Sequence, residues 1–153
     1  MLFLSIVQMH IGQYIDKERG YIMNNMKKFI DSLYFGDRFC EKMEIGNNKI
    51  LFQINCISRL EDGRTEWNYY SGKDIEHGCL VFDGVVEYYT NTELEFNDEI
   101  YSIDIIGNDD DLYSFVVYGC NVSDENVSTG IEFHIKAKQF YIFDPQQNCN
   151  IVE

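Results

Sequence analysis

The side chains of this 153-residue chain that could do chemistry are mostly carboxylates, and many of them lie in one stretch. No lysine or arginine occurs between Lys73 and Lys136, whereas 15 of the 26 acidic residues do. The formal net charge is −14. A folded surface of this sign attracts basic partners and repels nucleic acid and anionic membranes. The charge therefore predicts a basic protein partner rather than a reaction, with solubility alone as the alternative explanation.

Motifs for catalysis and cofactor binding are missing from the sequence. The chain contains no GxSxG, P-loop, GxGxxG or HExxH motif. Paired acids such as Glu93 and Glu95, or Asp98 and Glu99, would suit glycoside hydrolysis only if the fold placed two carboxylates across a sugar cleft. Their spacing in sequence does not show this. We therefore expect a protein that is not an enzyme and uses no cofactor.

Metal-binding patterns are also missing. Asp109, Asp110 and Asp111 could attract calcium, but the run lacks the alternating ligands, central glycine and distal glutamate of an EF-hand. A solvated hairpin tip explains these acids more simply. The five cysteines include no CxxC pair, and no histidine has zinc-type spacing to a cysteine pair. We expect reduced thiols in a cytoplasmic protein and no bound metal.

Aromatic residues that could anchor a partner occur together at Trp67, Tyr69 and Tyr70. Exposed aromatic side chains contribute strongly to binding at interfaces. Consecutive strand residues point to opposite faces, so at least one of the two tyrosines is expected on the surface. A core position for Trp67 is the alternative. The residues that we predict to contact a basic partner are Trp67, Tyr69, Tyr70, Glu93, Glu95, Asp98, Asp109, Asp110 and Asp111.

The elements that must position these residues are mostly strands. Aromatic residues make up 15% of the chain, while alanine and proline each occur once, and this composition favours β-structure. One short amphipathic helix is predicted over residues 24–33, where apolar residues have helical spacing. Alternation of apolar and polar residues predicts strands over 39–45, 49–60, 79–89, 99–106, 112–120 and 131–143, with an aromatic strand or edge at 67–70.

The connections are expected to be short. We predict a polar hairpin turn over residues 107–111, a loop over 121–130 and no regular structure after Pro145. There is no room for crossover helices, which excludes a parallel sheet. The expected fold is mainly β: a single-domain antiparallel β-sandwich or partly open barrel of six to seven strands, with one short N-terminal helix. Strand order and oligomeric state do not follow from the sequence.

The first 22 residues are expected to lie outside the folded domain. The run from Lys17 to Gly20 can be encoded by an almost unbroken purine tract two codons before Met23, the layout of a bacterial ribosome-binding site. We predict that translation starts at Met23, that residues 1–22 are a non-native leader or a disordered segment, and that 23–153 form one β-rich domain. The opening apolar run lacks the basic region and cleavage site of a signal peptide, in keeping with a cytoplasmic location.

Five short blocks carry a resemblance to known proteins. They are Tyr34–Cys40, Ser58–Leu60, Glu66–Tyr70, Leu80–Val85 and Asn97–Ile100. Their order resembles a family of uncharacterised small bacterial all-β proteins and, more remotely, the β-rich immunity proteins encoded beside polymorphic toxins. The resemblance covers about residues 29–144 and carries no catalytic residue.

The resemblance implies an immunity-type protein that neutralises a basic partner, such as a toxin nuclease. Acids on the surface would steer the encounter and a few aromatic side chains would anchor the complex. The alternative is a small-ligand or carbohydrate-binding β-module, with Trp67 and the tyrosines as stacking platforms. Salt separates the two hypotheses, because glycan binding would survive high salt and electrostatic steering would not. An enzyme with dispersed catalytic residues is a third possibility.

Overall fold

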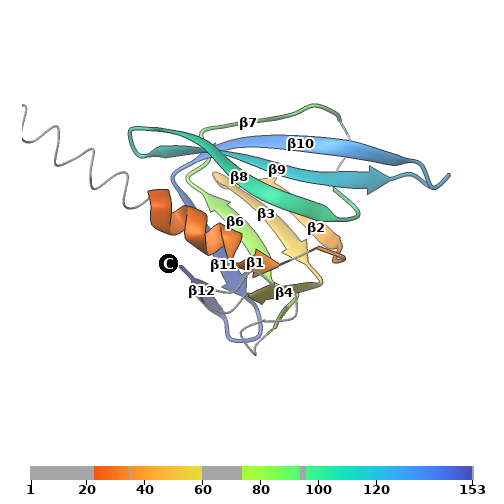
Figure 1. Ribbon diagram of the computed structural model, residues 1–153, viewed down its shortest axis with the longest axis horizontal. Helices are drawn as coiled ribbons and strands as arrows, with labels where there is room; N and C mark the ends of the chain where they lie inside the picture. Colours follow the sequence, from red (N-terminus) through yellow and green to blue (C-terminus); the bar gives the residue numbers. More distant parts are fainter. Residues whose placement is uncertain (1–22, 35, 60–73, 94–95, 153) are drawn as a thin grey trace, which may run out of the picture.

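The computed structural model describes residues 23–34, 36–59, 74–93 and 96–152. In these residues the chain forms one helix, over residues 23–31, and twelve strands in three antiparallel sheets (Figure 1). The mainly β class and the N-terminal helix are therefore confirmed. The sandwich of six to seven strands is not confirmed, because the strands are more numerous and divide among three sheets.

The two larger sheets hold nine of the strands. The four-stranded sheet has the order β7 (Glu87–Thr90), β10 (Ser128–Ala137), β9 (Leu112–Val122) and β8 (Ile100–Asp109). The five-stranded sheet has the order β12 (Cys149–Ile151), β11 (Gln139–Asp144), β6 (Cys79–Asp83), β3 (Lys49–Ile54) and β2 (Cys40–Gly46). A small sheet joins β1 (Leu33–Tyr34), β4 (Cys56–Arg59) and β5 (Ile75–Glu76).

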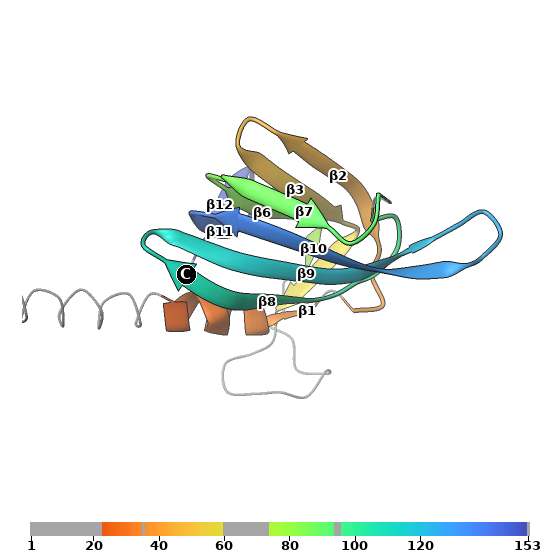
Figure 2. The same ribbon diagram turned by 90° about the horizontal axis from the view of Figure 1, so that it is seen from above.

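The hydrophobic core lies between the two larger sheets. Phe52 of β3 is fully buried, and its ring makes edge contacts with Phe82, Phe96 and Phe133 at centroid distances of 6.0, 5.3 and 5.8 Å. The helix lies beside β8 in both ribbon views (Figures 1 and 2) and adds Phe29 to this core. The four-stranded sheet therefore has one face toward the core and one face, seen from above in Figure 2, toward solvent.

Two long chain segments pass from one sheet into the other. The predicted strand 79–89 bends at Gly84, where φ is +67°, and becomes β6 and β7. The predicted strand 131–143 breaks at Lys138 and becomes β10 and β11. The two corners contact each other, because the amide of Lys138 donates to the carbonyl of Asp83 at 3.0 Å. Together they attach the two sheets along one side.

Three further boundaries differ from the sequence prediction. The predicted strand 49–60 divides at Asn55, whose backbone bonds to Phe39 and His77 instead of continuing the five-stranded sheet. The predicted loop 121–130 is largely part of the β9–β10 hairpin, with a turn between Val122 and Ser128. The tail after Pro145 forms β12 because it pairs with β11. In each case a partner distant in sequence determines the local structure.

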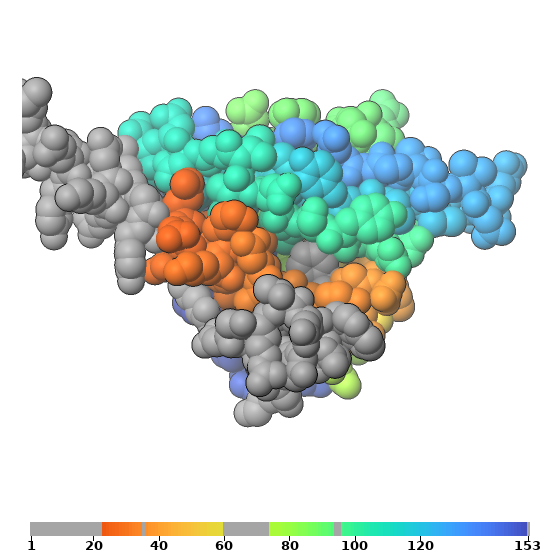
Figure 3. Space-filling model, in the orientation of Figure 1, coloured from red at the N-terminus to blue at the C-terminus, as the bar shows by residue number. Residues whose placement is uncertain are grey.

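The β9–β10 hairpin projects from the body at one end (Figure 3). All residues from Ser123 to Gly130 are exposed. The side chain of Asn97 bonds to both backbone groups of Val122, accepting from its amide at 2.9 Å and donating to its carbonyl at 3.0 Å. Asp124 and Glu125 therefore lie well away from the centre of the sheet.

Candidate functional site

The outward face of the four-stranded sheet carries polar and aromatic side chains from all four strands. The strand registers place Tyr89 opposite His134, His134 opposite Val116, and Val116 opposite Asp104, so one row crosses the whole sheet. The flanking rows contain Glu87, Lys136 and Ser114 on one side and Glu132, Tyr118 and Ser102 on the other. We call these side chains the outer face.

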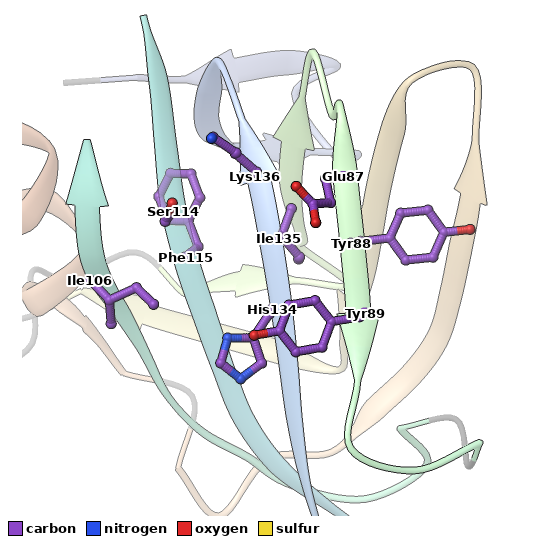
Figure 4. Close-up of a pocket in the computed structure, with 9 residues that line it drawn as sticks. All are labelled: Glu87, Tyr88, Tyr89, Ile106, Ser114, Phe115, His134, Ile135 and Lys136. Atoms are coloured by element: carbon purple, nitrogen blue, oxygen red, sulfur yellow. The ribbon is translucent and has the colours of Figure 1, made fainter. Parts of the chain in front are cut away.

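An aromatic stack lies at the β7 side of the outer face. The rings of Tyr89 and His134 are 4.4 Å apart between centroids and only 6° from parallel (Figure 4). His134 is half-buried, whereas Tyr89 is 57% exposed. The Nε2 atom of His134 lies 3.4 Å from a carboxylate oxygen of Glu132. The stack therefore presents one free face of an orientated tyrosine ring to solvent.

A shallow hollow of about 200 Å³ borders this stack. Its wall includes Glu87 and Lys136 from neighbouring strands, Ser114 of β9 and Ile106 of β8 (Figure 4). Ile106 is 60% exposed, so part of the wall is apolar and accessible. The hollow is open and mixed in character, which suits a docked side chain better than an enclosed small substrate.

The charge around the hollow is mainly negative. Among the described residues of these four strands, the carboxylates of Glu87, Asp104, Asp109 and Glu132 are accompanied by one ammonium group, that of Lys136. The Nζ atom of Lys136 lies 3.8 Å from a carboxylate oxygen of Asp109, and Lys136 is opposite Glu87 in the strand register. Exposed ion pairs of this kind contribute little to the free energy of folding. A cationic side chain from a partner could bind the remaining carboxylates, and a guanidinium could stack on Tyr89.

The structure describes five of the nine residues predicted to contact a partner, and these five lie in three places: after β7, before β8 and at the β8–β9 turn. Trp67, Tyr69, Tyr70 and Glu95 lie outside the described residues. Asp109 is the last residue of β8, and Asp110 and Asp111 form the β8–β9 turn, so this run is a hairpin tip as expected. Glu93 is exposed after β7. Asp98 is half-buried, and its backbone carbonyl accepts from the amide of Cys40 at 2.9 Å, which gives it a structural role.

Three residues of β7, Glu87, Tyr88 and Tyr89, were not among those predicted to contact a partner. A usable signal was present, because two consecutive tyrosines on a strand must point to opposite faces. In the structure Tyr88 is 48% exposed on the core side of the sheet, and Tyr89 is exposed on the outer face. His134 alternates with Glu132 and Lys136 along β10, which puts it on the outer face, but its stacking partner follows only from the β7–β10 register.

Two buried thiols, those of Cys40 and Cys79, are poorly suited to nucleophilic chemistry. All five cysteines fall within the described residues and are free. Burial raises the pKa of Cys40 to about 11 and also raises the pKa of Cys79, so both are protonated near neutral pH. Across the described ranges, no three metal-ligating side chains cluster. None of the helical structure described is long and apolar enough to cross a bilayer.

Fold and site together define a mainly β protein with an acidic and aromatic sheet face. Residues 23–153 match the family of unknown function DUF6258, and the chain belongs to that family. No curated protein and no solved structure matches the chain. Membership confirms the expected likeness to an uncharacterised family, while the likeness to immunity proteins and the start of translation at Met23 stay predictions.

Proposed function

We propose that the protein binds a basic protein partner through the outer face. The observation that supports this most directly is the exposed ring of Tyr89, held against His134 and bordered by Glu87 and Glu132. An aromatic ring that is already orientated loses little conformational entropy when a partner covers it. The adjacent carboxylates favour arginine or lysine as the contacting side chains.

The net charge of −14 supports the same proposal at longer range. Electrostatic attraction raises association rates of protein pairs from about 10⁵–10⁶ to as much as about 10⁸–10⁹ M⁻¹s⁻¹ at low salt. Screening shortens its reach to about 8 Å at physiological ionic strength. Acids lie just outside both ends of β9, Asp110 and Asp111 before it and Asp124 and Glu125 after it. These acids would steer a partner toward the protein, while the outer face would hold it.

The partner class that we propose is a toxin with a basic surface, such as a nuclease. An enzyme that acts on a polyanion needs positive charge around its active site, and an acidic protein can cover that charge. The proposal of an immunity-type protein rests on the sequence resemblance together with this charge complementarity. It places the protein in the cytoplasm, where the toxin would act.

The test begins with the gene neighbourhood. A neighbouring gene for a secreted protein with a toxin domain at its C-terminus would supply the binding partner, and co-expression should then protect cells from that toxin. Tyr89→Ala should weaken binding mainly through faster dissociation, by at least about 30-fold if this ring is a hot spot. A toxin whose binding is unaffected by Tyr89→Ala would overturn the outer face as the contact surface.

Two double variants separate the effect on binding of where the charges lie from the effect of net charge. Glu87→Lys with Glu132→Lys changes the outer face, and Asp124→Lys with Glu125→Lys makes the same change of net charge at the β9–β10 tip. Both should slow association at low salt, but only the outer-face pair should also speed dissociation. Equal effects on both rates would show that net charge alone acts, and no effect of either pair would leave solubility as the role of the acids.

A carbohydrate-binding module is the second candidate, favoured by the exposed tyrosine ring beside the polar hollow. Sugars stack on such rings, and their hydroxyl groups would bond to Ser114, Glu87 or Lys136. Glycan binding should persist at about 1 M salt, where the Debye length is about 3 Å. Binding to a glycan array at that salt, lost in Tyr89→Ala, would favour this function over the protein partner.

A further inference from the structure

In the part of the chain that the structure describes, no strand pairs with the second edge of β7, and this free edge offers backbone groups for pairing. β7 is a terminal strand of its sheet and pairs with β10 without a register shift. The amide of Asn91 donates to the carbonyl of Glu132 at 3.2 Å, and hydrogen-bonding residues alternate along an antiparallel strand. Glu87 and Tyr89 therefore bond to β10. The backbone groups of Tyr88 and Thr90 point away from β10, toward the free edge.

Hollows border β7 on both sides of the sheet. On the outer face lies the hollow beside Tyr89. On the core side, a second hollow of about 310 Å³ separates β7 from the β2–β3 hairpin, and its wall includes Ile45, Val86 and Tyr88. In Figure 4 the side chain of Tyr88 points toward that hairpin, away from Tyr89. Ile45, Val86 and Tyr88 are 44%, 58% and 48% exposed, so this side is open and carries apolar side chains, with Asn48 and Lys49 also in its wall.

The other terminal strands of the two larger sheets have features that oppose pairing. β8 has two register irregularities, β2 has one and carries exposed Lys42 and Glu44, and β12 has only three residues. Irregular or charged edges are the usual protection against strand addition. β7 is short, at four residues, but it has no bulge, lysine or proline within Glu87–Thr90. It is the terminal strand best suited to accept another strand.

We infer that an extended segment of the basic partner adds to β7 as a further strand of the four-stranded sheet; this rests on the proposed function. Side chains of an added strand alternate between the two faces of the sheet. Those on the outer side would meet the carboxylate of Glu87 and the ring of Tyr89, which favours lysine or arginine. Those on the core side would meet Ile45, Val86 and Tyr88, which favours valine, isoleucine or leucine. The recognised segment therefore alternates basic and apolar residues.

Three synthetic peptides of about eight residues, the upper part of the usual strand range, test this inference. The first alternates lysine and valine. The second has the same composition with lysines and valines in separate blocks, and the third is the alternating peptide with N-methyl groups on every second amide. All three carry the same charge. At physiological salt the alternating peptide should bind at least about tenfold more tightly than either control.

Hydrogen exchange gives a residue-level readout of the same complex. With the alternating peptide bound, the amides of Tyr88 and Thr90 should exchange more slowly, whereas those of Glu87 and Tyr89, already bonded to β10, should change little. Tyr88→Ser should weaken peptide binding. Tyr101→Ser, at a tyrosine that is 54% exposed on β8 at the opposite side of the sheet, is the matched control and should bind normally.

The outcomes separate strand addition from the proposed function. Equal, salt-sensitive binding of all three peptides would overturn strand addition and leave the acidic outer face as a binding surface. If none of the three peptides binds, strand addition is also overturned. The outer face would then still be tested by the binding of the toxin to the two double charge variants. Protection of Tyr88 and Thr90 in a dimer without peptide would show that β7 pairs with a second copy instead, which would equally overturn a partner segment.

Discussion

Tyr89 and His134 form a cross-strand pair in which the two rings lie parallel, 4.4 Å apart between centroids. They are direct neighbours in the β7–β10 register, on the face of the sheet that points to solvent. Side-chain pairs at such positions stabilise a sheet and restrict each other's rotamers. The stack therefore links the stability of a terminal strand to the orientation of the ring that we propose as a binding anchor.

Removing either ring should destabilise the protein modestly. Tyr89→Ala should lower the free energy of unfolding by about 0.5–1.5 kcal/mol, the usual contribution of an aromatic pair, as measured by urea denaturation. The double variant with His134→Ala should show a coupling energy of about 0.2–1 kcal/mol. Tyr101→Ala, at a similarly exposed position on β8, is the control and should cost less. A coupling energy of zero would mean that the stacked rings do not stabilise each other.

Close packing at Gly119 predicts a second, stronger effect. A Cβ atom at this position would lie 2.5 Å from the carbonyl oxygen of Glu99 and from the ring of Phe96, so the backbone would have to move. Gly119→Ala should lower the free energy of unfolding by about 1–3 kcal/mol, measured in the same urea titrations.

The matched control is Gly130, which lies one residue before the partner of Gly119 on β10. A Cβ there would have no atom within 4 Å. Gly130→Ala should be neutral or stabilising by up to about 1 kcal/mol, because alanine restricts the unfolded chain. Similar losses for both variants would contradict the packing described around Phe96.

Strands were predictable from the sequence where apolar and polar residues alternate within one continuous run. The run from Ile131 to Ala137 alternates apolar and polar residues, and in the structure it alternates between core and outer face. The corners at Gly84 and Lys138 were not predicted, because alternation continues through a bend. Gly84 is a visible signal, but the break at Lys138 depends on a hydrogen bond to Asp83, which is 55 residues away.

The candidate site was less predictable, because it depends on register. The density of acids along the sequence did not indicate that the β8–β9 and β9–β10 hairpins carry Asp110 and Glu125 to opposite ends of β9. The proximity of Tyr89 to His134 follows only from pairing of strands 45 residues apart. Exposure of one of two consecutive tyrosines, by contrast, is a local property, and it was available from the sequence.

Phe52 should be highly sensitive to truncation, because it lies at the centre of the aromatic core. Its side chain is fully buried and contacts three other phenylalanine rings. Phe52→Ala should lower the free energy of unfolding by about 3–5 kcal/mol, measured by denaturant titration. Phe39→Ala, at a phenylalanine that is 48% exposed, is the control and should cost much less. A small loss at Phe52 would contradict a single core shared by the two sheets.

The stability of the protein should depend on pH through the contact of His77 with Glu41. The Nδ1 atom of His77 lies 2.8 and 3.0 Å from the two carboxylate oxygens of Glu41. This hydrogen bond, together with the charge of Glu41, raises the pKa of His77 above its usual value of 6.5. A raised pKa in the folded state means that folding favours the protonated imidazole. The contact should therefore stabilise the protein fully below about pH 6.5, and the stabilisation should disappear as pH rises through the pKa of the folded state.

His77→Asn is the suitable variant, because φ at this position is +55° and asparagine tolerates that conformation. Its free energy of unfolding should fall below that of the wild type near pH 5 and approach it near pH 9, in urea titrations at several pH values. Glu41→Gln should remove most of this pH dependence, and in it the imidazole should titrate at lower pH by NMR. A difference between His77→Asn and wild type that grows with rising pH would show that folding favours the neutral imidazole, and the ion pair would then be absent in solution.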